Sequence, residues 1–271
     1  MYHRIKNITK DRYKIFKGSE IYQSLKHVPL LKEAKLSVGK AWNKRFPYSY
    51  QLHGDPILVK VFEQIGKAMR ATSIIETGTF LGSSTSLFAQ LFPDIPIYTG
   101  EINEVHYRKA QKRLQKFPNV HIFHRNSPEF LKEIIAQKLP GERPLFFLDA
   151  HWLDQWPLGE EIAIIAKELK SAVIFIDDFK VNDPRFAFDR YGDKECSLTM
   201  VNPYIHKKKA YHLFFPHYGS EVFHKEIDHP ELVGYPIIFQ EMPGLFQELK
   251  KDNFVQKYFV DASSLIKPSR N

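Results

Sequence analysis

The sequence predicts a doubly wound α/β fold, with helices on both faces of a mostly parallel, seven-stranded sheet. Strand patterns alternate with amphipathic helix patterns from residue 56 to residue 177. A glycine turn after the first strand leads directly into a helix start, which is typical of this fold class. The last two strand patterns have no clear helix between them, so we expect the last strand to run antiparallel to the others.

Each element follows from its residue pattern. Apolar residues recur at helical spacing from Ile57 to Met69, which indicates an amphipathic helix before the first strand. Pro128 and Pro157 suit the first turns of the helices that follow the third and fourth strands. The expected strands cover residues 73–77, 96–100, 120–124, 145–149, 172–177, 211–216 and 234–240, and the last two form a reversed pair at the sheet edge.

The first 55 residues differ from the rest of the chain in charge. The chain has 39 Lys and Arg against 31 Asp and Glu, a formal charge of +8. Residues 1–55 hold 12 of these basic residues and four of the acidic ones, which leaves 27 of each in residues 56–271. Aromatic residues are interleaved with the basic ones. We therefore expect residues 1–55 to form a basic helical cap that packs on a domain of residues 56–271. The alternative is that this segment binds an anionic partner.

Composition limits the cellular context. The sequence has no run of about 18 apolar residues that could span a bilayer, so we expect no membrane association. The N-terminus lacks the apolar core of a secretory signal. The single cysteine, Cys196, has no partner for an internal disulfide. These features predict a cytoplasmic protein.

Residues 74–85 combine a buried strand, a glycine turn and a helix start. Gly78 and Gly82 allow a tight turn and a close approach of backbone N–H groups to a ligand. Ser83 or Ser84 is a natural N-cap for the helix. A dinucleotide fingerprint needs two glycines separated by one residue, and a P-loop needs Gly-Lys-Ser/Thr, so the spacing excludes both.

Polar residues follow the second and third strands. Ligands of open α/β sheets bind beyond the carboxyl ends of the strands, so we expect Glu101 to accept hydrogen bonds from a ribose, with Ile102 against the base. A solvated loop carboxylate is the alternative for Glu101. Asn126 and Ser127 are expected to reach the edge of the base, although Ser127 can instead serve only as a helix cap.

Three carboxylates follow the fourth and fifth strands. Asp149 ends one strand, and Asp177 and Asp178 end the next. Such a cluster is costly unless a cation neutralises it, and oxygen ligands suit Mg²⁺, Mn²⁺ or Ca²⁺. The sequence therefore predicts a metal site formed by these three side chains.

The segment Glu76-x-Gly78-x-x-x-Gly82 after a strand resembles the first motif of class I S-adenosylmethionine-dependent methyltransferases, and the order of elements from about 56 to 240 is similar to their Rossmann-like fold. The resemblance implies that this loop wraps the methionine part of S-adenosylmethionine. The expected cofactor-binding residues are Glu76, Gly78, Thr79, Gly82, Ser84, Glu101, Ile102, Asn126, Ser127 and Asp149.

The carboxylates are similar to the metal site of catechol-type O-methyltransferases, in which a divalent ion chelates the acceptor oxygen. Macrocin-type O-methyltransferases are a closer match, with Asp-x-Asp-Trp after the fourth strand, where this chain has Asp149-Ala150-His151-Trp152. His151 replaces the second Asp. The resemblance implies Asp149 and His151 as catalytic residues, and a histidine can take a hydroxyl proton near neutral pH. A stacking or supporting role is the alternative for His151.

These features predict a metal-assisted O-methyltransferase for a small hydroxylated acceptor, such as a sugar or an aromatic diol. Residues 179–205 are expected to form a substrate loop with the N-terminal cap. Two alternatives remain open. An RNA methyltransferase would hold phosphates with the basic segment, and a non-catalytic S-adenosylmethionine-binding protein would need no metal.

Overall fold

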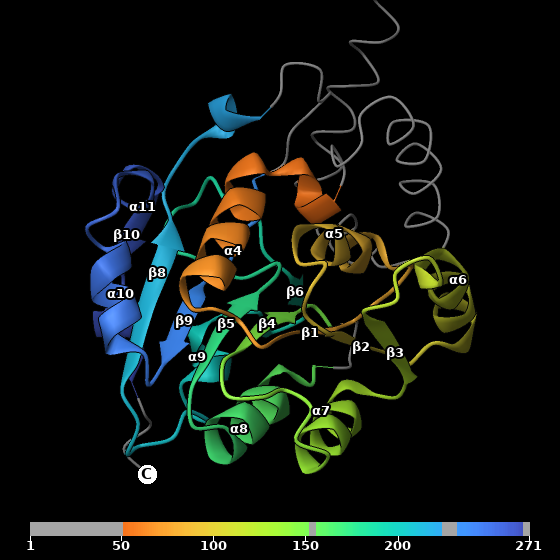
Figure 1. Cartoon of the computed structure of the whole chain (residues 1–271). Helices are drawn as coiled ribbons and strands as arrows, with labels where there is room; N and C mark the ends of the chain where they lie inside the picture. The colour runs from red at the N-terminus through yellow and green to blue at the C-terminus, as the bar shows by residue number, and fades with distance from the viewer. Residues whose placement is uncertain (1–50, 152–155, 224–231, 268–271) are drawn as a thin grey trace, which may run out of the picture.

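The computed structural model describes residues 51–151, 156–223 and 232–267 (Figure 1). Its main sheet has eight strands in the order β10-β8-β9-β5-β4-β1-β2-β3. Their bounds are β1 Ser73–Thr77, β2 Ile97–Glu101, β3 Val120–His124, β4 Pro144–Leu148, β5 Ala172–Ile176, β8 Tyr211–Pro216, β9 Ile237–Gln240 and β10 Phe259–Asp261. The longer helices are α4 Pro56–Ala68, α5 Ser83–Leu91, α6 Glu104–Leu114, α7 Ser127–Ala136 and α8 Leu158–Glu168.

The remaining elements are short. The 3₁₀ turn η1 Gln51–Gly54 precedes α4, and a small hairpin of β6 Arg190–Tyr191 and β7 Lys194–Glu195 follows β5. The others are α9 Leu198–Val201, η2 Ser220–Val222, α10 Pro243–Leu249, α11 Asn253–Tyr258 and η3 Ser263–Leu265. The predicted N-terminal cap lies outside the described residues except for its last five, 51–55, and remains a prediction.

The order of the strands in the sheet reverses at β1. β1 is parallel to β2 on one side and to β4 on the other, with Ile75 opposite Tyr98 and Phe146. The chain therefore builds the sheet outward through β2 and β3 before it crosses back to β4. Ligands of doubly wound sheets bind at the carboxyl ends of strands at such a reversal.

The predicted strand count of seven was wrong, because the sheet has eight strands. The predicted strands are all present, and the predicted antiparallel orientation of the last one is confirmed, since β9 is antiparallel to both β5 and β8. β9 lies between these two strands, and the unpredicted β10 forms the edge, antiparallel to β8. β10 is only three residues long, too short for an alternating pattern to identify.

Aromatic side chains fill the core on the α4 and α5 face of the sheet. Phe62 of α4 is fully buried, and its ring lies 4.4 Å from that of Phe88 in α5 and 5.0 Å from that of Phe175 in β5. Figure 1 shows α4 and α5 on one side of the sheet and α7 and α8 on the other. This packing fixes the positions of the strand ends that form the site.

Two helices already include the serines that we predicted as their caps, because each helix is capped by the residue before Ser83 or Ser127. Gly82, with φ 71°, precedes α5, so Ser83 and Ser84 lie inside the helix rather than capping it. Asn126 caps α7 by accepting a hydrogen bond from the Glu129 N–H, so Ser127 is the first helical residue. The predicted Ser caps were therefore wrong, which leaves these hydroxyls for other contacts.

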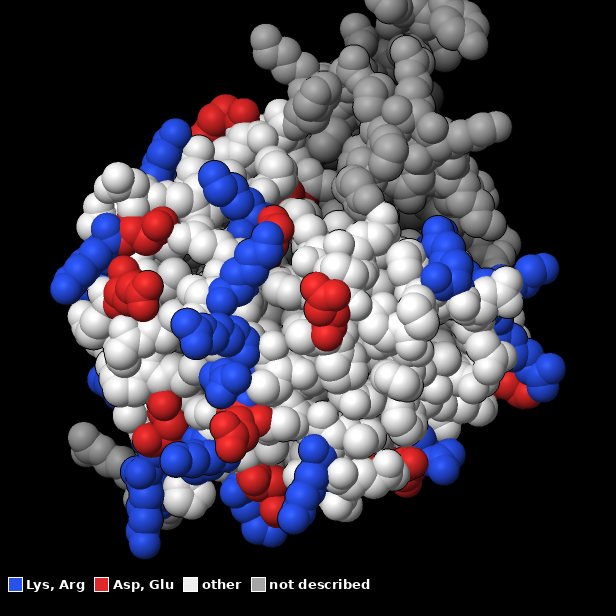
Figure 2. Space-filling model, viewed as in Figure 1, with Lys and Arg blue, Asp and Glu red and all other residues white. Residues whose placement is uncertain are grey.

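Charged side chains of both signs are interspersed over the described part of the face in Figure 2. Exposed ion pairs among the described residues include Lys67 with Glu63 and Lys132 with Glu160. Exposed pairs of this kind contribute little to stability. Within the residues that the structure describes, no helix is long and apolar enough to cross a membrane.

Candidate active site

The loops after β1 and β4 meet at the carboxyl edge of the sheet. The Asp149 N–H donates to the Thr77 carbonyl at 3.0 Å. Gly78 has φ 81°, and a Cβ there would lie 2.1 Å from the Asp149 carbonyl oxygen. Only glycine permits this approach, which brings the turn after the first strand against the first of the three acids.

Glu76 holds the start of α5 to the sheet. Its side chain is fully buried and accepts hydrogen bonds from the hydroxyls of Ser84 and Thr85 at 2.5 Å and of Thr99 in β2 at 2.6 Å. Thr79, also buried, contacts the same Thr99 hydroxyl at 2.6 Å. Glu76, Thr79 and Ser84 therefore connect the loop after β1 and the start of α5 to β2.

Burial raises the pKa of Glu76 from 4.5 to about 7, against the opposing effect of the three hydroxyl donors. The folded state therefore keeps a proton that the unfolded state releases, and the free energy of unfolding should fall as pH rises from about 4.5 to about 7. The shift corresponds to about 3 kcal/mol. Urea denaturation across this range should show that part of the fall missing in Glu76→Gln and retained in the surface control Glu248→Gln. Parallel profiles for all three proteins would contradict this explanation.

Glu101 lies at the end of β2 and faces the loop. Its carboxylate accepts hydrogen bonds from the Phe80 N–H at 2.6 Å and the Asn103 N–H at 2.8 Å. A carboxylate has about four acceptor positions and can accept hydrogen bonds from several donors at once. Ile102, beside it, is 54% exposed, as a residue that packs on a ligand requires.

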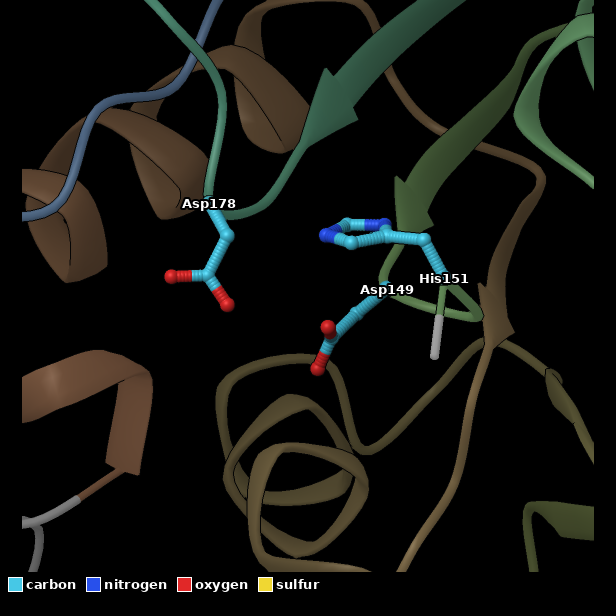
Figure 3. Close-up of side chains that lie close together, drawn as sticks. All are labelled: Asp149, His151 and Asp178. Atoms are coloured by element: carbon cyan, nitrogen blue, oxygen red, sulfur yellow. The ribbon is translucent and has the colours of Figure 1, made fainter. Parts of the chain in front are cut away.

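Asp149, His151 and Asp178 converge at the ends of β4 and β5. Each offers one ligand atom, and these atoms all lie within 4.8 Å of one another. Figure 3 shows the imidazole and the two carboxylates directed toward a common space. Asp178 has φ 50°, a backbone conformation that costs a non-glycine residue about 1–2 kcal/mol. Strain of this kind is often retained at functional sites.

Asp177 is not part of this group, although we predicted it as a ligand with Asp149 and Asp178. Its Oδ2 lies 2.8 Å from Nε2 of His53, a residue of η1 that the sequence analysis did not identify. Burial opposes protonation of His53, but the charge of Asp177 and the hydrogen bond to it, with Asp178 and Asp149, outweigh this and raise its pKa to about 10. His53 therefore supplies a positive charge to the acidic cluster.

His151 is enclosed by neighbours that the sequence did not reveal. Its ring stacks on Trp156, with centroids 5.6 Å apart. Its Nε2 lies 3.6 Å from Oδ2 of Asp189, beyond hydrogen-bond distance, and both side chains are almost completely buried. Asp189 belongs to the segment that we predicted as a substrate loop, and its N–H donates to the Asp178 carbonyl at 2.7 Å. This segment therefore folds back over the acidic cluster.

Cys196 anchors the same segment. Its N–H donates to the Asp189 carbonyl at 3.0 Å, and its thiol is fully buried and lies 3.8 Å from the Asp177 carbonyl oxygen. Burial raises the pKa of the Cys196 thiol well above its usual range, and the charges of Asp189 and Asp178 add to the rise. The thiol is therefore an inert packing group rather than a nucleophile.

The donor set fits a divalent cation. Two carboxylates and an imidazole at mutual distances below 5 Å match the chelating groups of a small ion, and the two acids repel each other without one. Carboxylates suit Mg²⁺, Mn²⁺ and Ca²⁺, whereas an imidazole favours Mn²⁺ and other transition metals over Mg²⁺. The third ligand, Asp177 or His151, would therefore influence which metal is preferred.

Solved methyltransferase structures are similar to this chain. One is an O-methyltransferase from Bacillus cereus in complex with SAH, with 17% identity, a TM-score of 0.47 and coverage of 80% of this chain and 95% of the other. Another is the O-methyltransferase TomG from Streptomyces achromogenes, in complex with SAM, with 18% identity, a TM-score of 0.44 and coverage of 67% and 78%.

A third similar structure is the precorrin-6y C5,15-methyltransferase from Geobacter metallireducens, with 18% identity, a TM-score of 0.42 and coverage of 67% and 86%. No protein-family model matches the sequence, and no curated protein sequence matches it significantly. The likeness is distant, so the function proposed below depends on this chain's own residues.

Proposed function

We propose that the chain is an S-adenosylmethionine-dependent O-methyltransferase that uses a divalent cation and acts on a small hydroxylated acceptor. The observation that carries this proposal is the meeting of two features at one sheet edge. The glycine turn at Gly78 contacts Asp149, which also belongs to the group of potential metal ligands. A methyl donor in the turn would therefore lie beside an acceptor held at the acids.

The turn supplies the cofactor site. The backbone of Gly78 to Gly82 would bind the methionine part of S-adenosylmethionine, and Glu101 would accept hydrogen bonds from the ribose hydroxyls. Ile102 would cover one face of the adenine. Asn126 takes a smaller part than the sequence suggested, because its side-chain oxygen caps α7.

The acids supply the cation site. Asp149 and Asp178 would hold the ion, with Asp177 as the third ligand if its contact with His53 opens and His151 if it does not. When bound, the cation orients the acceptor hydroxyl and lowers its pKa. The three carboxylates and the His53 imidazolium together carry a charge of about −2, which matches one divalent ion.

The remaining chemistry needs alignment and a proton acceptor. Methyl transfer requires the acceptor oxygen to lie in line with the sulfonium, which a rigid site supplies without covalent help. If Asp177 is the third metal ligand, His151 would be free of the metal and would accept the proton of the acceptor hydroxyl. The sheet edge, with the segment around Asp189 folded over it, would keep water from the reacting atoms.

The Glu101→Ala variant tests the cofactor site. We expect its affinity for S-adenosylhomocysteine to fall by about 1–3 kcal/mol, roughly 5- to 150-fold, because the ribose hydroxyls lose their acceptor. Isothermal titration calorimetry measures the change, and Glu104→Ala, an exposed acid that pairs with Arg108 nearby, is the matched control. Equal affinity in the wild type and Glu101→Ala would remove Glu101 from the cofactor site.

A further inference from the structure

His53 lies at the boundary between the acidic cluster and solvent. It belongs to η1, the turn that leads into α4, and its Nε2 lies 2.8 Å from Oδ2 of Asp177. The Asp177 side chain is almost completely buried, whereas the His53 side chain is 31% exposed. The imidazole therefore has a route to solvent that the carboxylate does not have.

The backbone of η1 is strained where it presents His53. Leu52 and His53 have φ values of 49° and 60°, in the left-handed region that is unfavourable for residues with a side chain. Gly54 follows with φ 71°, which a glycine adopts freely. Strain of this kind persists only where the surrounding structure fixes the conformation. The contact with Asp177 is therefore made by a turn that is not in its preferred conformation.

Both sides of the turn are anchored to the domain. Leu52 is buried in the core, and its carbonyl accepts a hydrogen bond from the Asp55 N–H at 3.0 Å. Asp55 is buried, caps α4 and accepts a hydrogen bond from the Tyr218 hydroxyl. These anchors hold the turn in place. The His53 side chain is therefore the part of η1 that can leave Asp177.

The Asp177 carboxylate is only partly satisfied by this contact. Its Oδ1 is buried and has no hydrogen-bond partner among the described residues. Buried polar atoms in native proteins usually have a partner, so an exception of this kind indicates an additional ligand. Asp177 directly precedes Asp178, whose side chain converges with those of Asp149 and His151. The position and the incomplete bonding of Asp177 suit a cation ligand that is held by His53.

We propose that His53 competes with the divalent cation for Asp177 and thereby sets the cation affinity of the site. When the imidazole leaves, the Asp177 carboxylate joins Asp149 and Asp178 as the third ligand, and relaxation of the strained turn offsets part of the lost hydrogen bond. His53 is a positioning residue in this scheme, because it acts through Asp177. The inference rests on the proposed function, since it concerns the cation site of the same enzyme.

Mn²⁺ binding to the full chain, measured from the electron paramagnetic resonance signal of the free ion, tests this inference. We expect His53→Asn to bind Mn²⁺ about 10-fold more tightly than the wild type, because apparent affinity is reduced by the fraction of molecules in which the site is closed. Asparagine tolerates a left-handed backbone, so the turn is retained while the shorter side chain loses Asp177. His217→Asn, which replaces an exposed histidine near Asp183, should leave the affinity unchanged.

The same substitution in an Asp177→Asn background separates competition from a general effect of charge. Loss of a positive imidazole would strengthen cation binding by Coulomb attraction whether or not Asp177 is a ligand. If competition is the cause, the gain should shrink to about twofold or less in this background, where the imidazole has no carboxylate to hold. An equal gain in both backgrounds would overturn the inference.

The direction of the change is equally decisive. Weaker Mn²⁺ binding in His53→Asn would overturn the inference, because residues that support a ligand weaken the site when they are removed. Unchanged binding would overturn it too, since His53 would not limit access to Asp177. His53→Gly is the second variant, should His53→Asn fail to fold, and the same tightening is expected. Absence of Mn²⁺ binding in the wild type and in both variants would contradict the proposed cation site itself, which keeps the two failures distinct.

Discussion

Asp178→Asn is expected to weaken Mn²⁺ binding by about 100-fold or more, because it removes one of the two carboxylates that face the common space with His151. Affinity for S-adenosylhomocysteine should stay within about twofold, since the cation is proposed to contact the acceptor rather than the cofactor. Calorimetry with each ligand measures both. Asp193→Asn, an exposed acid in the β6–β7 turn, is the control. Wild-type Mn²⁺ affinity in Asp178→Asn would contradict the proposed cation site.

Asp177→Asn separates the two possible sets of metal ligands. If Asp177 leaves His53 to bind the ion, this variant should lose Mn²⁺ affinity as severely as Asp178→Asn. If Asp177 only holds His53, the loss should be about 10-fold or less, as for residues that act through a ligand. The larger loss would restore the ligand set that the sequence predicts.

Gly78→Ala is the second large effect, because it combines a strained backbone with a collision. Alanine at φ 81° costs about 1–2 kcal/mol, and its Cβ would lie 2.1 Å from the Asp149 carbonyl oxygen. The β1 and β4 loops must then separate. We expect a loss of about 2–4 kcal/mol in the free energy of unfolding and at least a 10-fold loss in affinity for S-adenosylhomocysteine.

Gly192→Ala is the matched control for this collision. Gly192 also has a positive φ, 57°, but a Cβ there would meet nothing within 4 Å. It should therefore show the backbone cost of about 1–2 kcal/mol and no change in affinity. Urea denaturation and calorimetry of both variants give the comparison. Equal effects of the two substitutions would mean that the contact between Gly78 and Asp149 has no role in the site.

Most of the fold could be predicted because its signals are local. The strands at 145–148 and 172–176 are continuous apolar runs, and the helices of the sheet have one apolar face. The helix starts were predicted less well, because a Ser at the first helical positions and a Ser at the cap look alike in sequence. The last strand of the sheet, Phe259–Asp261, is too short to carry a pattern.

The site could be predicted only in part, for a related reason. Asp149 and Asp178 follow adjacent strands, and topology alone brings such residues together. The pairing of Asp177 with His53 spans 124 positions along the chain, and no periodicity connects the two. The position of Asp189 beside His151 likewise depends on how a loop packs. Partners of this kind become visible only when the tertiary structure is known.

A crystal structure of the full chain grown with S-adenosylhomocysteine and Mn²⁺ tests the central claim most directly, because it locates cofactor and cation together. We expect the homocysteine part along Gly78 to Gly82, the ribose at Glu101, and an anomalous Mn²⁺ peak bound by Asp149 and Asp178, within about 6 Å of the sulfur. A cofactor bound elsewhere, or a cation site away from these two acids, would contradict the proposal that one edge of the sheet brings donor and acceptor together.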